Sequence, residues 1–239
     1  MLPLLRCRDR QPELMDDPSL DEIEHRAALV GLRRVNGISR SAAILWPSIL
    51  RLARKESSQR LRILDIACGG GDVTVAIAAR AAAAGISMQV DGCDISPVAI
   101  QMAREAASQS KLPSSTHFFQ SDILNDDISD SYDIVMCSLF LHHLSELDSC
   151  RLLNRMVDLA RTLILVNDLR RTRLGYALAW MGCRLLSRSP IVHVDGPMSV
   201  RGAYSVGEVL DLAETCGLHG ATMTTRWPQR FLLEWNRPA

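Results

Sequence analysis

Ile-Leu-Asp-Ile-Ala-Cys-Gly-Gly-Gly-Asp-Val-Thr, at residues 63–74, is the stretch that decides the fold. An apolar run ends in glycines and then opens a helical pattern, which predicts a buried strand, a tight loop and a helix start. Such a loop holds a nucleotide-like cofactor at the mouth of a parallel sheet. A dinucleotide loop needs a third glycine, but here Thr74 takes that position, and Asp65 and Asp72 flank the loop. Two carboxylates would repel a pyrophosphate and suit a ligand that carries an ammonium and a sulfonium.

Strands and helices alternate from Leu61 onward, which predicts a doubly wound, Rossmann-like α/β fold with a mostly parallel seven-stranded sheet and an antiparallel C-terminal hairpin. The predicted strands lie at 61–67, 88–94, 116–120, 132–138 and 162–168, and the hairpin at 221–226 and 230–235. The predicted helices lie at 72–84, 97–109, 148–160, 173–186 and 205–216. Residues 187–200, which contain glycine and proline, are predicted to be irregular.

The first part of the chain is predicted to be helical, because apolar residues recur at roughly helical spacing from Leu14 to Arg54. We assign residues 1–58 to an N-terminal helical lid and residues 59–239 to the main domain, with a substrate-side insertion at about 170–204. The alternative is that these helices only cover the sheet. The apolar helix predicted at 173–186 either lines a substrate pocket or belongs to the core.

Composition limits the classes of function. Lys+Arg and Asp+Glu are equal at 27 each, and this balance argues against a nucleic-acid partner. The seven cysteines are scattered without a C-x-x-C pair, so we expect reduced core residues in a cytoplasmic protein rather than disulfides or a zinc site. Residues 1–6 are too short for the apolar region of a signal peptide, and no apolar run reaches the ~18 residues of a membrane-spanning helix. Stable membrane insertion is therefore not expected.

Two more acids follow the next two predicted strands. Asp94 stands at the tip of the second strand, where a carboxylate can accept hydrogen bonds from both ribose hydroxyls. Asp122 stands at the tip of the third strand, in Gln-Ser-Asp-Ile at residues 120–123. Each acid alone is more often a helix cap or a solvated turn residue. Three acids at successive strand tips, with Asp65 as the first, favour a binding site.

The glycine-rich stretch resembles motif I of the class I S-adenosylmethionine-dependent methyltransferases, and the resemblance extends over about residues 61–170. It implies S-adenosylmethionine as the cofactor, with its methionine end at the loop, its adenine amine at Asp122, and the backbone after the fourth strand close by. The cofactor residues that it implies are Asp65, Ala67, Cys68, Gly69, Gly71, Asp94, Ile95, Asp122, Ile123, Ser138 and Leu139. Motif I often has glycine at the position of Ala67, where we expect a strand-end conformation that tolerates a methyl group.

The chain is most similar to the small-molecule enzymes grouped with the ubiquinone and menaquinone biosynthesis methyltransferases. Its later segments, at residues 167–171 and 193–204, resemble bacterial methyltransferases associated with polyketide or quinone-like lipids. Enzymes that methylate base amino groups commonly carry an Asn-Pro-Pro-Tyr-like turn after the fourth strand. Residues 137–140 are Cys-Ser-Leu-Phe, which disfavours that substrate.

Methyl transfer from a sulfonium needs alignment, exclusion of water and, for a hydroxyl acceptor, a base near neutral pH. Histidine suits this role, and the candidates are His193, in the segment predicted to be irregular with Asp195 nearby, and His142 and His143 after the fourth strand. Candidate substrate-binding residues are Arg171, Arg201 and Tyr204. No metal ligands are assigned.

The sequence thus predicts a cytoplasmic methyltransferase, monomeric or homodimeric, that acts on a hydroxyl or an activated ring carbon of an apolar, aromatic, polyketide- or quinone-like molecule. An RNA or protein methyltransferase and a non-catalytic S-adenosylmethionine-binding protein are the alternatives. An NAD-dependent dehydrogenase is disfavoured by Thr74.

Overall fold

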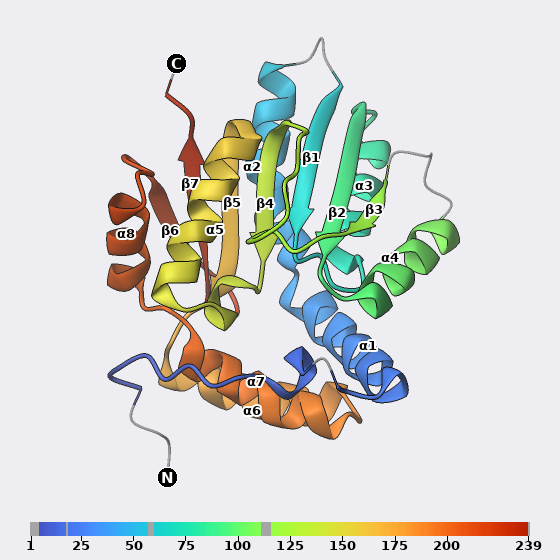
Figure 1. Ribbon diagram of the computed structural model, residues 1–239, viewed down its shortest axis with the longest axis vertical. Coiled ribbons are helices and arrows are strands. Elements are labelled where there is room, and N and C mark those ends of the chain that lie inside the picture. The colour runs from blue at the N-terminus through green and yellow to red at the C-terminus, as the bar shows by residue number, and fades with distance from the viewer. Residues whose placement is uncertain (1–4, 18, 57–59, 111–115, 239) are drawn as a thin grey trace.

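A seven-stranded sheet of order β3-β2-β1-β4-β5-β7-β6 forms the centre of the molecule (Figure 1). The computed structural model describes residues 5–17, 19–56, 60–110 and 116–238. The strands are β1 (Leu61–Ile66), β2 (Met88–Asp94), β3 (Phe118–Gln120), β4 (Tyr132–Ser138), β5 (Ala160–Leu169), β6 (Thr222–Arg226) and β7 (Arg230–Asn236). The first five strands are parallel, and β7 pairs antiparallel with both β5 and β6. The predicted α/β fold with its antiparallel hairpin is confirmed.

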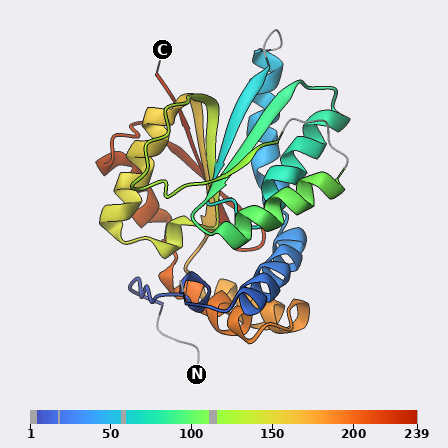
Figure 2. The same cartoon turned by 45° about the vertical axis from the view of Figure 1, so that its right-hand side comes forward.

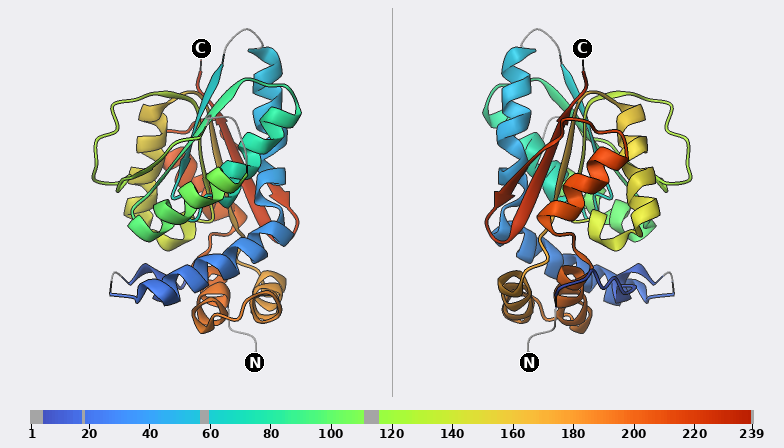
Figure 3. Two further views of the ribbon diagram at one scale, coloured as in Figure 1. Left: turned by 90° about the vertical axis from the view of Figure 1, so that its right-hand side faces the viewer. Right: turned by 90° about the vertical axis from the view of Figure 1, so that its left-hand side faces the viewer.

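Helices cover both faces of the sheet, as the side views in Figure 3 show. On one face, α2 (Ser41–Lys55) and α3 (Asp72–Ala83) pack on β1 and β4 through side chains such as Leu45 and Ile77, while α4 (Pro97–Gln109) packs near β2 and β3. On the other face, α5 (Glu146–Leu159) and α8 (Val206–Thr215) bury apolar side chains against β4 and β5. Because both faces of the parallel strands are covered, their sequences are apolar runs without alternation.

A third group of helices lies across the carboxyl ends of the parallel strands (Figures 1 and 2). It consists of α1 (Glu22–Ser39), α6 (Arg173–Leu186) and α7 (Pro190–Gly202). The short 3-10 helix η1 (Leu14–Asp16) contacts α7, and the 3-10 helix η2 (Leu141–His143) contacts both α7 and β5. Residues that are far apart in the sequence therefore meet at the sheet edge where this fold class binds its ligands.

The prediction that residues 187–200 are irregular is wrong, because α7 occupies Pro190–Gly202. Pro197 cannot donate to the carbonyl of His193 four residues earlier, and the guanidinium of Arg184 donates to that carbonyl instead, at 3.4 Å. A Cβ on Gly196 would come within 2.2 Å of Cys183 Sγ, so glycine permits the close approach of α7 to α6. These residues break isolated helices, and contacts with α6 override that local tendency.

Two of the cysteines are also not as predicted. Cys150 of α5 and Cys216, which follows α8, are joined by a disulfide, with their Cα atoms 5.4 Å apart. The expectation that no disulfide forms is wrong for this pair, because packing of α5 on α8 brings together two residues that are 66 positions apart in sequence. Within the described ranges, no helix is both long and apolar enough to cross a membrane.

Candidate active site

The glycine-rich loop joins β1 to α3 and carries a buried carboxyl group. Thr74 Oγ1 donates a hydrogen bond to Asp65 Oδ2 at 2.6 Å, so the residue that replaces the third glycine holds the acid of the motif. Burial raises the pKa of Asp65 to about 7, and the hydroxyl of Thr74 only partly opposes this. A cationic group beside Asp65 would favour its ionised form.

Backbone conformation explains the glycines of this loop and corrects the expectation for Ala67. Gly69 and Gly71 have φ of 53° and 74°, and a Cβ on Gly71 would lie 2.8 Å from Ala103 Cβ. Ala67 also has a positive φ, of 52°, rather than the expected strand-end conformation. Its methyl group therefore occupies a left-handed conformation that costs an L-residue about 1 kcal/mol or more.

The acids at the next two strand tips bond to nearby backbone N–H groups. Asp94 accepts from Gly69 N at 2.8 Å and from Ser96 N at 2.9 Å, and so ties the end of β2 to the glycine-rich loop. Burial raises the pKa of Asp94. Asp122 accepts from Leu124 N and Asn125 Nδ2, within its own turn.

The residues beside these two acids differ in exposure. Ile95, next to Asp94, is exposed, whereas Ile123, next to Asp122, is buried. Ile95 therefore offers an apolar surface beside the carboxylate of Asp94.

The turn after β4 is fixed from β5. Asn167 Nδ2 donates to Ser138 Oγ at 2.7 Å, and Leu139 N donates to Asn167 O at 2.8 Å. Leu139 has φ of 60°, another left-handed residue outside glycine, and the chain turns there into η2. Strained residues of this kind concentrate at functional sites.

Cys68 lies in the glycine-rich loop between β1 and α3. Its side chain is buried, and burial raises the pKa of its thiol.

Helix α1 lies against the glycine-rich loop. The side chain of Leu29 is the nearest neighbour of a Cβ built on Gly69, at 3.9 Å. The side chain of Asn36 hydrogen-bonds to Asp72 at the start of α3. By contrast, α2 packs on the face of the sheet. Helix α2 therefore covers the sheet, whereas α1 contacts the glycine-rich loop and the start of α3.

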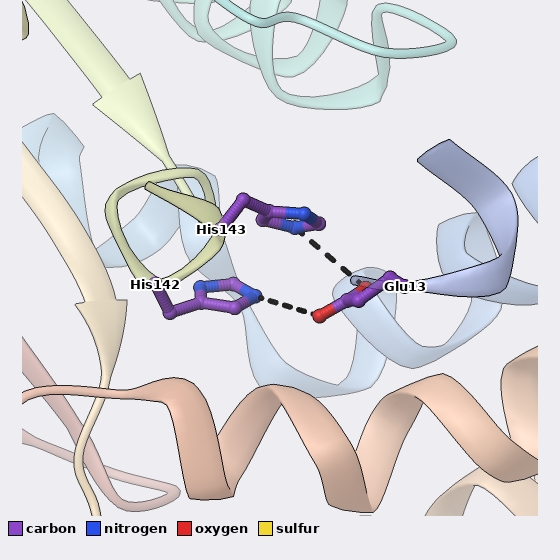
Figure 4. A group of neighbouring side chains, drawn as sticks. All are labelled: Glu13, His142 and His143. Atoms are coloured by element: carbon purple, nitrogen blue, oxygen red, sulfur yellow. Dashed lines mark ion pairs between the residues drawn. The ribbon is translucent and has the colours of Figure 1, made fainter. Parts of the chain in front are cut away.

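Two histidines and the carboxylate of Glu13 gather at the end of β4 (Figure 4). His142 Nδ1 lies 2.6 Å from Asp168 Oδ1, and His143 Nδ1 lies 2.8 Å from Asp16 Oδ2. A carboxylate only accepts, so each Nδ1 carries the proton and each Nε2 is the remaining ring nitrogen. Both Nε2 atoms face Glu13, at 3.6 Å from Oε1 for His142 and 3.7 Å from Oε2 for His143.

The charges of this cluster stabilise one another. Burial alone would lower the pKa of His143, but Glu13 and Asp16 outweigh it and raise that pKa to about 9. Burial alone would raise the pKa of Asp168, yet electrostatic attraction to the His142 ring and the hydrogen bond with it lower that pKa. His143 therefore holds its proton at neutral pH, while Asp168 is an ionised partner for His142.

An N-terminal segment, residues 5–17, closes the cluster from the solvent side. Arg8 donates to His142 O, Leu144 O and Gly202 O and lies over the ring of Tyr204, 3.9 Å from its centroid. Glu13 is buried and accepts from Ser199 Oγ at 2.6 Å. Glu13, Asp16 and the role of Asp168 could not be predicted from the sequence, because only the fold brings these residues to His142 and His143.

The remaining predicted residues have other partners. His193 Nε2 lies 2.8 Å from Ser187 O, within the α6–α7 pair. Asp195, which we expected beside His193, instead accepts from Leu14 N and Met15 N at 3.0 Å. The predicted substrate residues bond within the protein: Arg171 to Glu208 and Ala203, Arg201 to Asp9, and Tyr204 to Arg8 and Ser149.

Sheet order, glycine-rich loop and strand-tip acids define an α/β protein of the class that binds a nucleotide-like cofactor at the carboxyl edge of its sheet. Residues 63–162 match the family model described as a methyltransferase domain. The match covers this part of the chain, and it confirms the resemblance to class I S-adenosylmethionine-dependent methyltransferases. A search of curated proteins found no match.

Solved structures share the fold at low sequence identity. Magnesium protoporphyrin IX methyltransferase from Synechocystis PCC 6803, with bound SAH, is 17% identical with a TM-score of 0.56, over 93% of this chain and 90% of that one. The methyltransferase SibL in its apo form is 20% identical with a TM-score of 0.64, over 97% of this chain and 64% of SibL. The plantazolicin methyltransferase BpumL, in complex with an analog and SAH, is 15% identical with a TM-score of 0.60, over 90% of this chain and 96% of BpumL.

Proposed function

We propose that this protein transfers a methyl group from S-adenosylmethionine to a hydroxyl, or to a ring carbon activated by a hydroxyl, of an apolar small molecule. The observation that carries the proposal is the His142–Asp168 pair at the end of β4, on the same sheet edge as the loop of Gly69 and Gly71. The family match supports methyl transfer, and the named structures include enzymes of small molecules.

The cofactor half of the proposal assigns roles to the strand-tip residues. Asp65 and the loop at Gly69 and Gly71 take the methionine end, Asp94 takes the ribose hydroxyls, and Asp122 takes the adenine amine. For Asp94 this requires that the ribose hydroxyls share the carboxylate with the N–H groups of Gly69 and Ser96. Each carboxylate oxygen can accept more than one hydrogen bond. The exposed side chain of Ile95 offers an apolar surface for the adenine ring.

The acceptor half assigns proton removal to His142. Asp168 fixes the tautomer with the proton on Nδ1, so Nε2 has a lone pair that can accept the proton of an acceptor hydroxyl. S-adenosylmethionine supplies the methyl group, which passes to the acceptor as its bond to sulfur breaks and the electron pair stays on sulfur. His143 suits this role less well, because its pKa of about 9 keeps it protonated at neutral pH. His193 faces Ser187 and is the weaker candidate.

We also propose that α1 and residues 5–17 act as the lid of the site and exclude water during transfer. Leu29 of α1 lies against the loop, and Arg8 and Glu13 cover the histidines. Helix α6 exposes the apolar side chains of Leu174, Trp180, Met181 and Leu185, and we propose that an apolar acceptor contacts this surface.

Calorimetric titration tests the cofactor half. Wild-type protein should bind S-adenosylmethionine, and Asp94→Ala should weaken binding at least tenfold, because the ribose hydroxyls lose their acceptor. Asp127→Ala, which removes an almost fully exposed carboxylate, is the matched control and should bind normally. Absence of binding to the wild type would refute the proposal.

A panel of phenols and quinols tests the acceptor half. We expect S-adenosylhomocysteine and a methylated product from at least one member, and mass spectrometry of the product would distinguish oxygen from carbon methylation. Binding of S-adenosylmethionine without turnover of any phenol, quinol or aliphatic alcohol would contradict the substrate class.

A further inference from the structure

We propose that Glu13, His142 and His143 form a binding site for a divalent transition-metal ion, and that Zn²⁺ is the ion that suits it best. One ligand atom from each residue lies within 4.8 Å of the other two. These atoms are His142 Nε2, His143 Nε2 and a carboxylate oxygen of Glu13, and Figure 4 shows the two rings turned toward the carboxylate.

The spacing of these atoms is close to that of a metal site. With metal–ligand bonds of about 2.0–2.1 Å, neighbouring tetrahedral ligands lie roughly 3.3–3.5 Å apart. His142 Nε2 lies 3.6 Å from Glu13 Oε1 and His143 Nε2 lies 3.7 Å from Glu13 Oε2, separations that are too long for hydrogen bonds and only slightly longer than the tetrahedral edge. With one ligand atom taken from each residue, the three atoms lie within 4.8 Å of one another. Small side-chain movements would therefore complete the coordination.

Each ligand also has the outer partner that metal ligands usually have. Asp168 accepts from His142 Nδ1 and Asp16 accepts from His143 Nδ1, so both rings present Nε2 to the same point. Ser199 Oγ donates to Glu13 Oε1 and orients that carboxylate. Carboxylates behind ligating imidazoles fix the ring and raise the basicity of the ligating nitrogen. Binding of the metal ion would displace the Nε2 proton that His143 carries at neutral pH.

The charge and the burial of the cluster favour a cation. Three carboxylates, those of Glu13, Asp16 and Asp168, surround two imidazoles, and Asp195 lies close enough to interact with Glu13. Glu13 and His142 are buried, where unpaired charge is costly. Two nitrogen ligands select Zn²⁺ or a neighbouring transition metal over Mg²⁺, which prefers oxygen ligands.

Two imidazoles and one carboxylate leave a coordination position open, as in catalytic zinc sites. This step rests on the proposed function: an acceptor hydroxyl bound at that position would lose its proton more readily. In the metal-loaded enzyme His142 would then orient the ion, whereas in the metal-free enzyme its Nε2 would act as the base. Binding of the ion itself rests only on the geometry described above.

Metal binding can be measured without any turnover. After treatment with a chelator and its removal, full-length protein should bind one equivalent of Zn²⁺ in calorimetry, and Mg²⁺ should not compete. Co²⁺ should give the visible absorption of nitrogen and oxygen ligation without a thiolate charge-transfer band, which excludes the free cysteines as ligands.

Variants then locate the ion. Glu13→Gln and His143→Gln should each weaken Zn²⁺ binding at least tenfold, and Asp168→Asn should weaken it about 10–100-fold through the outer partner of His142. His219→Gln is the matched control, because His219 is exposed and also paired with a carboxylate, that of Glu214. Circular dichroism verifies folding, and Ser199→Ala, which keeps all three ligands, should weaken binding less than Glu13→Gln does.

Two results would overturn the proposal: no Zn²⁺ binding to folded wild-type protein, or binding that Glu13→Gln and His143→Gln leave unchanged. Titration of S-adenosylmethionine in the presence of chelator separates this outcome from failure of the proposed function. Cofactor binding without Zn²⁺ binding refutes only the metal site. Zn²⁺ binding without cofactor binding refutes only the methyltransferase proposal.

Discussion

The proposed cofactor side and the proposed acceptor side of the site are built in different ways. The cofactor side comes from one continuous stretch, β1, the glycine-rich loop and α3, with one acid from each of the next two strand tips. The acceptor side is assembled from residues 13–16, η2, the end of β5 and α7, which are up to 186 residues apart in the Ser199–Glu13 hydrogen bond. A continuous motif can be recognised in sequence, whereas an assembled cluster becomes visible only in the fold.

The largest effect is expected from the acceptor side. His142→Gln should lower kcat by about 10²–10⁴-fold, the usual contribution of a positioned proton-transfer group, with little change in S-adenosylmethionine affinity. His193→Gln tests the alternative in the segment that was predicted to be irregular, and His219→Gln is the exposed control. A larger loss of kcat for His193→Gln than for His142→Gln would contradict our choice of base and with it the assembled site.

On the cofactor side, the largest effect is a pH-dependent difference in stability. The pKa of Asp65 rises from 3.8 to about 7 on folding, so folding takes up a proton between these pH values. The contribution of Asp65 to stability is complete at low pH and is lost as pH rises through about 7. Asp65→Asn does not ionise, and its free energy of unfolding should exceed that of the wild type increasingly with pH, by about 2–4 kcal/mol at pH 8.

Chemical denaturation of both proteins at several pH values, without cofactor, measures this difference. Asp127→Asn removes an almost fully exposed carboxyl group and should show no such trend. A difference between Asp65→Asn and wild type that stays constant from pH 5 to pH 8 would show that the carboxyl of Asp65 is not desolvated.

Much of the fold could be predicted because each local signal agreed with the final packing. The predicted bounds of β2 and β4 are those of the structure, since apolar runs end at acids or turns. The error was α7, where Gly196 and Pro197 argue against a helix and contacts with other elements, such as those with Cys183 and Arg184 of α6, stabilise one. A prediction from local helix propensity does not include contacts with a helix that lies elsewhere in the sequence.

Some residues of the candidate site could be predicted from the sequence and others could not. Asp65 and Asp94 could be placed from sequence because parallel strands put their carboxyl ends at one edge. His142 and His143 were chosen by residue type alone. Glu13 and Asp16 carry no sequence signal of their own, because their role depends on where the segment of residues 5–17 lies.

A third prediction concerns the space around the loop. Gly71→Ala should destabilise the protein by about 1–3 kcal/mol more than Gly85→Ala, because a Cβ on Gly71 would approach Ala103 and Phe118 at 2.8 and 3.1 Å. Gly85 has a similar φ, of 67° against 74°, but nothing lies within 4 Å of its Cβ position. Denaturant unfolding measures both, and equal losses would mean that backbone conformation alone requires the glycine.

The smallest expected effect is a change in stability that tests the left-handed backbone conformation of Ala67 in the loop. Ala67→Gly relieves a left-handed alanine that costs about 1–2 kcal/mol. It also increases the entropy of the unfolded chain, at a cost of about 0.4–1 kcal/mol. The net expectation is a stabilisation of roughly 0.5 kcal/mol, the opposite sign to most glycine substitutions. Ala82→Gly, at an exposed position of α3, is the control and should destabilise by about 0.5–1 kcal/mol. If both variants lose stability equally, Ala67 is not strained, and the fold accommodates its methyl group as the sequence predicted.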